Sequence, residues 1–259
     1  MRNLGSAQYV FAIASASVAL LSLAYGDFAP GGTSLPAWIP WRTTVVYGVA
    51  LLVLAASGGL CCSATALRSV LTIGWYFAAW ALIGVPMVLS KPLSVDGWYG
   101  FIEALSSLVG AWILYAGLRW RSRGSEIPIA HQRAPRAAQM VFGLTCVFYG
   151  WSHFVYADFT AGMVPGWLPG RLEVAYFTGF CHVAAGIALI IRLLPGLAAT
   201  LEAIMMSLFG LLVWVPSFFV WPRPGWATPP ENQWSELVVT LLVTVSAWIV
   251  AASTRASTR

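Results

Sequence analysis

The sequence predicts an all-α, polytopic membrane protein with eight transmembrane helices, arranged as two parallel four-helix repeats. Three observations support this fold class. The chain of 259 residues is 59% hydrophobic and only 9% charged, which is more apolar surface than a soluble core of ordinary proportions can bury. It contains eight apolar runs long enough to cross roughly 30 Å of hydrocarbon. A motif at the ends of these runs occurs twice, which indicates a tandem duplication.

Each apolar run has about the 20 residues that a bilayer-spanning helix needs. The runs cover residues 6–25, 43–62, 66–90, 98–117, 137–156, 172–192, 196–220 and 234–253. None shows the polar alternation of an outer-membrane strand, and a helix satisfies its own backbone groups in lipid. The first run could pass for a signal peptide, but the duplication pairs it with an internal run. We therefore expect it to remain as a helix.

The repeated motif lies where predicted helices meet water. The first copy reads Tyr25-Gly26-Asp27-Phe28, then Pro36-Ala37-Trp38-Ile39-Pro40-Trp41-Arg42 and Tyr47. The second reads Tyr156-Ala157-Asp158-Phe159, then Pro165-Gly166-Trp167-Leu168-Pro169-Gly170-Arg171 and Tyr176. The two prolines three residues apart interrupt a helix. Each copy therefore predicts a non-helical, tryptophan-bearing loop after the first helix of its repeat.

The repeats define the expected domains. Residues 1–118 form the first four-helix repeat, 119–136 a basic linker rich in Arg, Ser and Pro, and 137–259 the second repeat. Four helices is an even number, so both repeats enter the membrane in the same direction. This predicts a parallel pseudo-two-fold axis along the membrane normal. Trp98 and Trp112 pair with Trp234 and Trp248 at one common offset.

The arginine distribution predicts the orientation. The N-terminus, the second, fourth and sixth connections and the C-terminus together hold Arg2, Arg68, Arg119, Arg121, Arg123, Arg133, Arg136, Arg192, Arg255 and Arg259. The opposite side holds only Arg42, Lys91, Arg171 and Arg223. By the positive-inside rule, both termini are cytoplasmic. The net charge of +5 therefore reflects topology rather than nucleic-acid binding.

The second half resembles a known family. Its sequence contains Gly150-Trp151-Ser152-His153-Phe154, Met163-Val164-Pro165-Gly166-Trp167-Leu168-Pro169 and Tyr176-Phe177-Thr178-Gly179. These segments resemble the DoxX-like family of small four-helix bacterial membrane proteins, over most of residues 137–253, and the first half repeats the pattern more weakly. The resemblance implies a four-helix bundle, the bacterial inner membrane and, in some members, quinone-linked oxidation of reduced sulfur compounds. Related redox families use a CxxC motif that this chain lacks, so disulfide exchange is not implied.

Three ionisable residues of the second repeat are candidate catalytic residues. His153, Glu173 and His182 stand where the first repeat has Ser22, Thr44 and Val53. Ionisable groups at membrane depth are costly and therefore suggest function, so we expect all three to line one cavity under loop 165–169. Histidine titrates near pH 7 and suits proton relay for quinone chemistry. Two histidines that bridge helices with structural hydrogen bonds are the alternative.

The loop residues Trp167, Arg171, Asp158 and Tyr176 are candidate ligand-binding residues. The alternative interpretation makes Trp167 an interfacial anchor, and makes Asp158 and Arg171 an ion pair that clamps the loop, as Asp27 and Arg42 would in the first repeat. Glu202, near the cytoplasmic end of the seventh run, could pair with Arg192 or Arg68 or reach solvent.

No metal centre is predicted. The two histidines would differ in depth by roughly 8 Å at 1.5 Å per residue, which suits a proton path or two ends of a ligand better than one metal. The cysteines Cys61, Cys62, Cys146 and Cys181 have no metal-ligand spacing. A redox pair of Cys146 and Cys181 would need Cα atoms within about 7 Å, and their flanking residues lack the features that activate a thiol.

Three functions remain open from the sequence. The leading interpretation is an inner-membrane subunit that binds a quinone or similar lipophilic ligand and is accessory to oxidoreductase chemistry, with membrane lipids, a lipophilic small molecule and a redox protein as partners. A second is a non-enzymatic protein that binds lipid or a small solute, or a transporter that uses the pseudo-two-fold interface. A third is a membrane scaffold for a soluble redox partner. The sequence leaves intrinsic enzymatic activity undecided.

Overall fold

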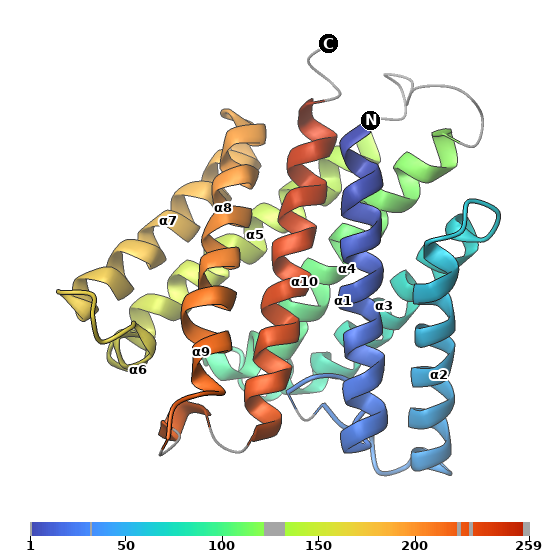
Figure 1. Cartoon of the computed structure of the whole chain (residues 1–259), viewed down its shortest axis with the longest axis horizontal. Helices are drawn as coiled ribbons and strands as arrows, with labels where there is room; N and C mark the ends of the chain where they lie inside the picture. The colour runs from blue at the N-terminus through green and yellow to red at the C-terminus, as the bar shows by residue number, and fades with distance from the viewer. Residues whose placement is uncertain (1, 32, 122–132, 222–223, 228–229, 256–259) are drawn as a thin grey trace.

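Long helices lie side by side through the molecule (Figure 1). The computed structural model describes residues 2–31, 33–121, 133–221, 224–227 and 230–255, and every regular element in these ranges is helical. The long helices are α1 (Arg2–Tyr25), α2 (Arg42–Leu60), α3 (Ala66–Ser90), α4 (Val95–Arg121), α5 (Arg133–Val155), α7 (Arg171–Ile191), α8 (Pro195–Phe209) and α10 (Pro230–Arg255). The short ones are α6 (Ala157–Met163), the π-helix η2 (Gly210–Trp214), α9 (Val215–Ser217) and the 3₁₀-helix η3 (Gly225–Ala227).

The helices confirm an all-α, polytopic membrane protein. Seven spans among the described residues are long and apolar enough to cross a bilayer, with α8, η2 and α9 together forming one of them, Pro195–Ser217. The pair α5 and α6 provides an eighth span when taken together, although their axes differ by 94°. The chain turns at Tyr156, whose backbone leaves the helical region. The predicted fifth span, 137–156, therefore corresponds to α5, and α6 bends away from its end.

Helices from both halves of the chain form the centre of the bundle. Helix α1 packs against α10, α4 packs against α5, and α4 also packs against α10. Helices α2 and α3 lie to one side of this centre, and α7 and α8 lie to the other (Figure 1). A parallel duplication would make the α1–α10 and α5–α4 contacts equivalent by symmetry. The duplication itself stays a prediction.

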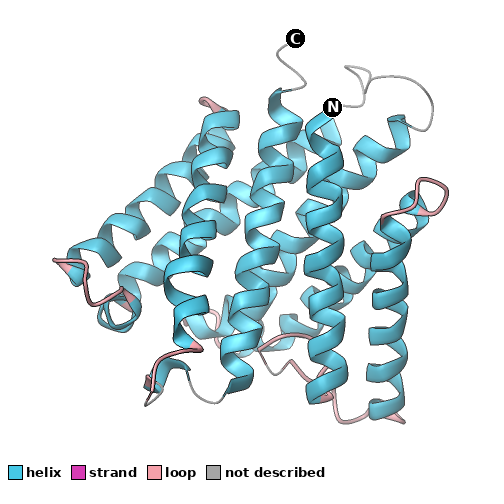
Figure 2. Ribbon diagram, in the orientation of Figure 1, coloured by secondary structure: helices cyan, strands magenta, loops and turns pink. Residues whose placement is uncertain are grey.

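Both ends of the described chain lie at the same end of the bundle. Helix α1 begins there and α10 ends there (Figure 1). The loops that follow α1, α3 and α6 lie at the opposite end (Figure 2). This layout is what an even number of spans requires. Most of the predicted linker 119–136 falls on residues 122–132, outside the described residues, while α4 continues to Arg121 and α5 starts at Arg133.

The two proline-tryptophan loops share a local backbone conformation. Ile39 N donates to Pro36 O and Leu168 N donates to Pro165 O, each at 3.0 Å. The residue before each following helix is left-handed, with φ of 51° at Trp41 and 64° at Gly170. Glycine adopts this conformation without steric cost, whereas Trp41 pays for the clash of its Cβ with the backbone.

The segments before these loops differ, which corrects one expectation. Residues 157–163 form the helix α6, whereas we expected a non-helical connection on both sides. The first half instead makes a tight turn at Gly31 (φ 76°) that brings Ala29 to pair with Thr33. Glycine is needed here because of the positive φ.

Candidate functional site

Glycines bring α5 and α7 into close contact, and this contact places both histidines. An added Cβ at Gly150 would lie 2.5 Å from the carbonyl oxygen of Gly179, and one at Gly186 would lie 2.5 Å from that of Gly143. These small residues on α7 admit a neighbouring helix, and the neighbour is α5. His153 and His182 each follow a contact glycine by three residues.

The two histidine rings lie against each other. Their centroids are 5.1 Å apart with planes at 70°. The ring of Phe209 from α8 lies 5.9 Å from His153 and 5.8 Å from His182, and Tyr149 lies 5.9 Å from His182. His153 Nδ1 is 3.0 Å from Thr178 Oγ1 and 3.4 Å from Ala175 O. The imidazoles are therefore held in an aromatic enclosure between three helices.

A buried ion pair joins α7 to α8. His182 Nδ1 is 2.8 Å from Glu202 Oε1, and the two side chains are 1% and 0% exposed. The second carboxylate oxygen, Glu202 Oε2, is buried without a hydrogen-bond partner. The expected pairing of Glu202 with Arg192 or Arg68 is therefore wrong.

The partner follows from the hairpin geometry. Helices α7 and α8 are antiparallel around a short turn at Arg192, and His182 and Glu202 each lie ten residues from Arg192 along the sequence. Residues equidistant from a helical turn lie at the same depth on neighbouring helices. An acid buried in lipid needs a partner at its own depth. The equal distances of His182 and Glu202 from the turn are visible in the sequence and could have predicted this pairing.

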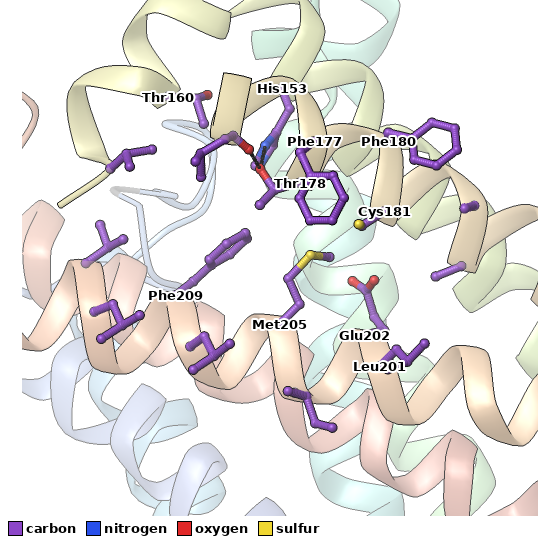
Figure 3. Close-up of a pocket in the computed structure, with 18 of the residues that line it drawn as sticks. His153, Thr160, Phe177, Thr178, Phe180, Cys181, Leu201, Glu202, Met205 and Phe209 are labelled. Atoms are coloured by element: carbon purple, nitrogen blue, oxygen red, sulfur yellow. Dashed lines mark hydrogen bonds between the residues drawn. The ribbon is translucent and has the colours of Figure 1, made fainter. Parts of the chain in front are cut away.

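A cavity of about 810 Å³ lies between α7 and α8, and its lining includes Pro165 and Leu168 of loop 165–169. Figure 3 shows Phe177 and Cys181 on one side, with Leu201, Glu202, Met205 and Phe209 rising from α8 on the other. The lining is almost entirely apolar, and its polar side chains are His153, Thr160, Thr178, Cys181 and Glu202. The volume is within the range of small-molecule sites.

The cavity lies beside the apolar outer surface of the bundle. Phe177 is 65% exposed, and Phe180, Leu197 and Leu201 are exposed beside it, all of them lining residues. In a membrane these side chains contact acyl chains. A molecule dissolved in the bilayer could therefore enter sideways between α7 and α8.

A π-helical turn shapes the end of the cavity nearer loop 165–169. The segment Gly210–Trp214 winds as η2, and Leu212, Val213 and Trp214 line the cavity. Pro216 lacks the amide hydrogen that an α-helix would direct to Leu212 O. Single π turns of this kind occur often at functional sites. Pro216 is the only local signal of this widened turn in the segment 210–217.

The structure separates the three predicted catalytic residues. His153 lines the cavity, and His182 lies behind Glu202, to which it is bonded. Glu173 is exposed in the first turn of α7, and its carboxylate lies close to Gly170. A carboxylate there stabilises the helix N-terminus. Of the three, only His153 lines the cavity, and Glu173 lies at the exposed N-terminal end of α7, outside the lining.

The predicted ligand-binding residues lie around the loop and not in the cavity lining. Trp167 is 71% exposed, which suits an interfacial anchor. Tyr176 stacks on Phe154 with centroids 6.2 Å apart. Arg171 donates to Gly162 O at 2.7 Å, and Asp158 is exposed on α6. The loop is held by this hydrogen bond, and among the described residues no Asp158–Arg171 ion pair forms.

The predicted ion pair of the first repeat is likewise replaced. Asp27 accepts a hydrogen bond from Ser34 Oγ at 2.8 Å, and within the described chain it makes no ion pair with Arg42. A short hydroxyl within the same loop satisfies this carboxylate locally. The long arginine side chain is therefore not needed to close the loop.

A second buried polar cluster lies where α4 meets α10. Glu103 is buried and interacts electrostatically with Glu236 across this contact. Ser106 and Tyr149 share a hydrogen bond of 2.9 Å beside it. Tyr149 also contacts His182. Polar side chains thus connect the centre of the bundle to the histidine pair, which the sequence, read one helix at a time, did not predict.

The cysteines and potential metal ligands do not form a further centre. All four cysteines are free, with Cys146 buried near Glu202 and Cys181 on the cavity wall. Among the residues that the structure describes, no group of three or more His, Cys, Asp or Glu side chains is arranged to hold a metal ion. The chemistry available at this site is proton transfer and hydrogen bonding.

Comparison of the chain with models of protein families, with curated proteins and with solved structures gives no match.

Proposed function

We propose that this membrane protein binds a lipophilic small molecule in the cavity between α7 and α8. One observation carries the proposal: Glu202 lines an apolar cavity, and one of its carboxylate oxygens, Oε2, is buried without a hydrogen-bond partner. A buried polar atom without a hydrogen bond is costly, and native structures normally satisfy it. A ligand head group that bonds Glu202, with a hydrocarbon body against Phe177, Leu201 and Met205, would supply what is missing.

We further propose that the ligand is of the quinone class and that the protein serves oxidoreductase chemistry in the bacterial inner membrane. The support is the resemblance of residues 137–253 to the DoxX-like family, together with His153 in the cavity lining, whose imidazole can accept and donate a proton. The protein would be an accessory subunit that works with a redox protein, and both termini would be cytoplasmic.

Transport along the pseudo-two-fold interface is less well supported. The contact of α4 with α10 is tight at Gly110, where an added Cβ would overlap the Ser246 hydroxyl and lie 3.1 Å from Phe11. Such packing leaves no room for a solute on this path. The cavity instead lies outside the central helices, beside lipid.

The test is to identify what the protein carries. The full chain is purified in mild detergent, and small molecules retained by it are identified by mass spectrometry. Ala188, which lines the cavity, is changed to Phe to fill it, and Ile187, the exposed neighbouring residue that does not line it, is changed to Phe as the control. We expect a lipophilic molecule in the wild type and in Ile187→Phe, and its loss in Ala188→Phe.

If both variants retain the same molecule, its binding site is not the cavity between α7 and α8. Recovery of bilayer lipid alone in all three proteins would contradict the proposed function. A quinone in the wild-type sample would support the finer assignment, and a lipophile of another class would overturn it.

A further inference from the structure

We infer that the cavity recognises a lipophilic molecule that presents a hydroxyl at its head, such as a long-chain phenol or hydroquinone, in preference to the corresponding ether or quinone. The inference rests on the proposed function and adds the chemical class of the head group. It follows from the polar atoms available in the cavity, because those of His153 and Glu202 that remain without partners both accept hydrogen bonds.

The first acceptor is His153 Nε2. Its other ring nitrogen, Nδ1, lies 3.4 Å from Ala175 O, which can only accept. Nδ1 also lies 3.0 Å from Thr178 Oγ1. The Thr178 hydroxyl already donates toward Val174 O or Ala175 O, each at 3.0 Å, so it accepts from the histidine. Nδ1 therefore carries the proton.

A neutral imidazole has one proton, so Nε2 of His153 keeps its lone pair. Among the described residues, no side chain or backbone group donates to this nitrogen, and His153 is part of the cavity lining. The contact with Thr178 thus sets the tautomer of His153, because the hydrogen bond made by one ring nitrogen determines which nitrogen carries the proton.

The second acceptor is Glu202 Oε2. Oε1 lies 2.8 Å from His182 Nδ1. With the shared proton between these two atoms, Oε2 has only lone pairs and acts as an acceptor. Oε2 has no hydrogen-bond partner, and the residue is 1% exposed. The nearby thiol of Cys146 is at most a weak donor. Figure 3 shows the carboxylate raised from α8 towards the cavity side chains of α7.

The other polar groups of the lining leave these two acceptors unpaired. Thr178 is already bonded, and the Thr160 hydroxyl can donate or accept. The Trp214 indole and the Cys181 thiol are donors, and among the described residues neither is hydrogen-bonded to either acceptor. A ligand hydroxyl would satisfy a buried acceptor. An ether or quinone oxygen in the same place has no hydrogen to donate, so its lone pairs would face those of the buried acceptor and the acceptor would stay unpaired. Buried polar sites reject analogues that lack a donor for this reason.

The experiment is a competition in native mass spectrometry. The full-length protein, stripped of retained molecules by detergent exchange, is incubated with equal concentrations of 4-dodecylphenol and 4-dodecylanisole. These two probes have the same tail, are stable in air and differ by one methyl group on the oxygen. We expect the phenol complex to exceed the anisole complex by about tenfold, because one hydrogen bond to a buried acceptor is made in one and lost in the other.

Two variants remove the acceptors independently. Glu202→Gln replaces Oε1 and Oε2 by an amide that both donates and accepts, and His153→Phe removes Nε2 while keeping an aromatic ring against Phe209. Each should bring the phenol-to-anisole ratio toward one. Glu173→Gln, which removes an exposed carboxylate outside the cavity, should leave the ratio unchanged. The use of two sites keeps the test valid if one variant fails to fold.

The outcomes separate the inference from the function on which it rests. Equal binding of both probes by the wild type would overturn donor recognition and leave lipophilic binding intact. A phenol-to-anisole ratio that stays unchanged in both folded variants would also overturn it. Binding of neither probe, with only bilayer lipid retained, would reject the proposed function as well.

Discussion

At the scale of single residues, the unusual feature is a carboxylate buried in a membrane helix with one oxygen unpaired. Ion pairs inside a protein seldom stabilise it more than apolar residues of similar volume, because both charges lose hydration. The pair of His182 and Glu202 is therefore poorly explained by stability alone. A binding role for the free oxygen explains why a costly group is kept there.

His182→Ala should destabilise the protein by about 3–5 kcal/mol, because it leaves Glu202 charged and buried without a partner. The double variant His182→Phe/Glu202→Leu removes both charges and should be close to the wild type in stability. The free energy of unfolding in mixed micelles measures both. If His182→Ala lowers the free energy of unfolding only slightly, and the double variant lowers it by the same amount, then this explanation of the pair is wrong.

Gly170 is needed for its backbone conformation. It stands at φ 64° before α7, and an added Cβ would lie 3.0 Å from Glu173 Oε2. Gly170→Ala should therefore cost about 1–2 kcal/mol in unfolding free energy. Gly166→Ala, in the same loop with open space and no positive φ, is the control and should change the stability little. Equal effects of the two substitutions would contradict this reasoning.

At the scale of elements, the contact of α5 with α7 determines where the two histidines lie. Gly143 and Gly150 on one helix meet Gly186 and Gly179 on the other, so the two backbones approach closely and the histidines that follow come together. Helix α8 is held less closely to α7, and the space between them is the cavity. The close contact of α5 with α7 thus forms one wall of the cavity, and the looser contact of α7 with α8 leaves the space of the cavity itself.

Gly150→Ala should push α5 from α7, since its Cβ would lie 2.5 Å from Gly179 O and 2.5 Å from Val183 Cγ2. We expect a loss of about 1–3 kcal/mol, as for overpacking in a well-packed core, together with weaker ligand retention. Gly48→Ala on α2, with nothing within 4 Å, should instead stabilise its helix by up to about 1 kcal/mol. Unfolding in mixed micelles compares them, and a neutral Gly150→Ala would refute the close contact.

At the scale of the whole molecule, both ends of the described chain lie on one side of the bundle (Figure 1). The turn between α2 and α3 lies on this side, and the turn between α3 and α4 lies on the other. The exposed cysteines Cys61 and Cys62 occupy the first turn. The pKa of the Cys62 thiol is below its usual value, chiefly because the Ala64 amide hydrogen-bonds to it, with a contribution from Thr65. A larger fraction of Cys62 is therefore the reactive thiolate at neutral pH.

A thiol reagent that cannot cross membranes tests this arrangement and the proposed orientation. In intact cells, Cys61 and Cys62 should stay unlabelled until the membrane is permeabilised. In a Cys61→Ser/Cys62→Ser background, Leu93→Cys, at a position 91% exposed between α3 and α4, should label without permeabilisation. Labelling of Cys62 from outside would reverse the orientation, and labelling of both positions from one side would rule out this fold.

The sequence by itself determined where the helices lie and where they end. Spans depend on local hydropathy, and loops 36–41 and 165–170 depend on prolines that act on their own neighbours. These local causes determined the spans and the loop conformation. The helix α6 was not predicted because residues 157–163 have neither a strong apolar pattern nor a proline that would mark the start or end of a helix.

Only the tertiary structure decided which side chains meet. His182 meets Glu202 because the turn at Arg192 places them at equal depth and the two helices face each other there. Glu173, on the same helix as His182, points to another face and leaves the site. Hydropathy gives the depth of a residue but not the rotation of its helix or the identity of its neighbour. The unpaired oxygen of Glu202, on which the proposed function rests, therefore appears only when α5, α7 and α8 are packed together.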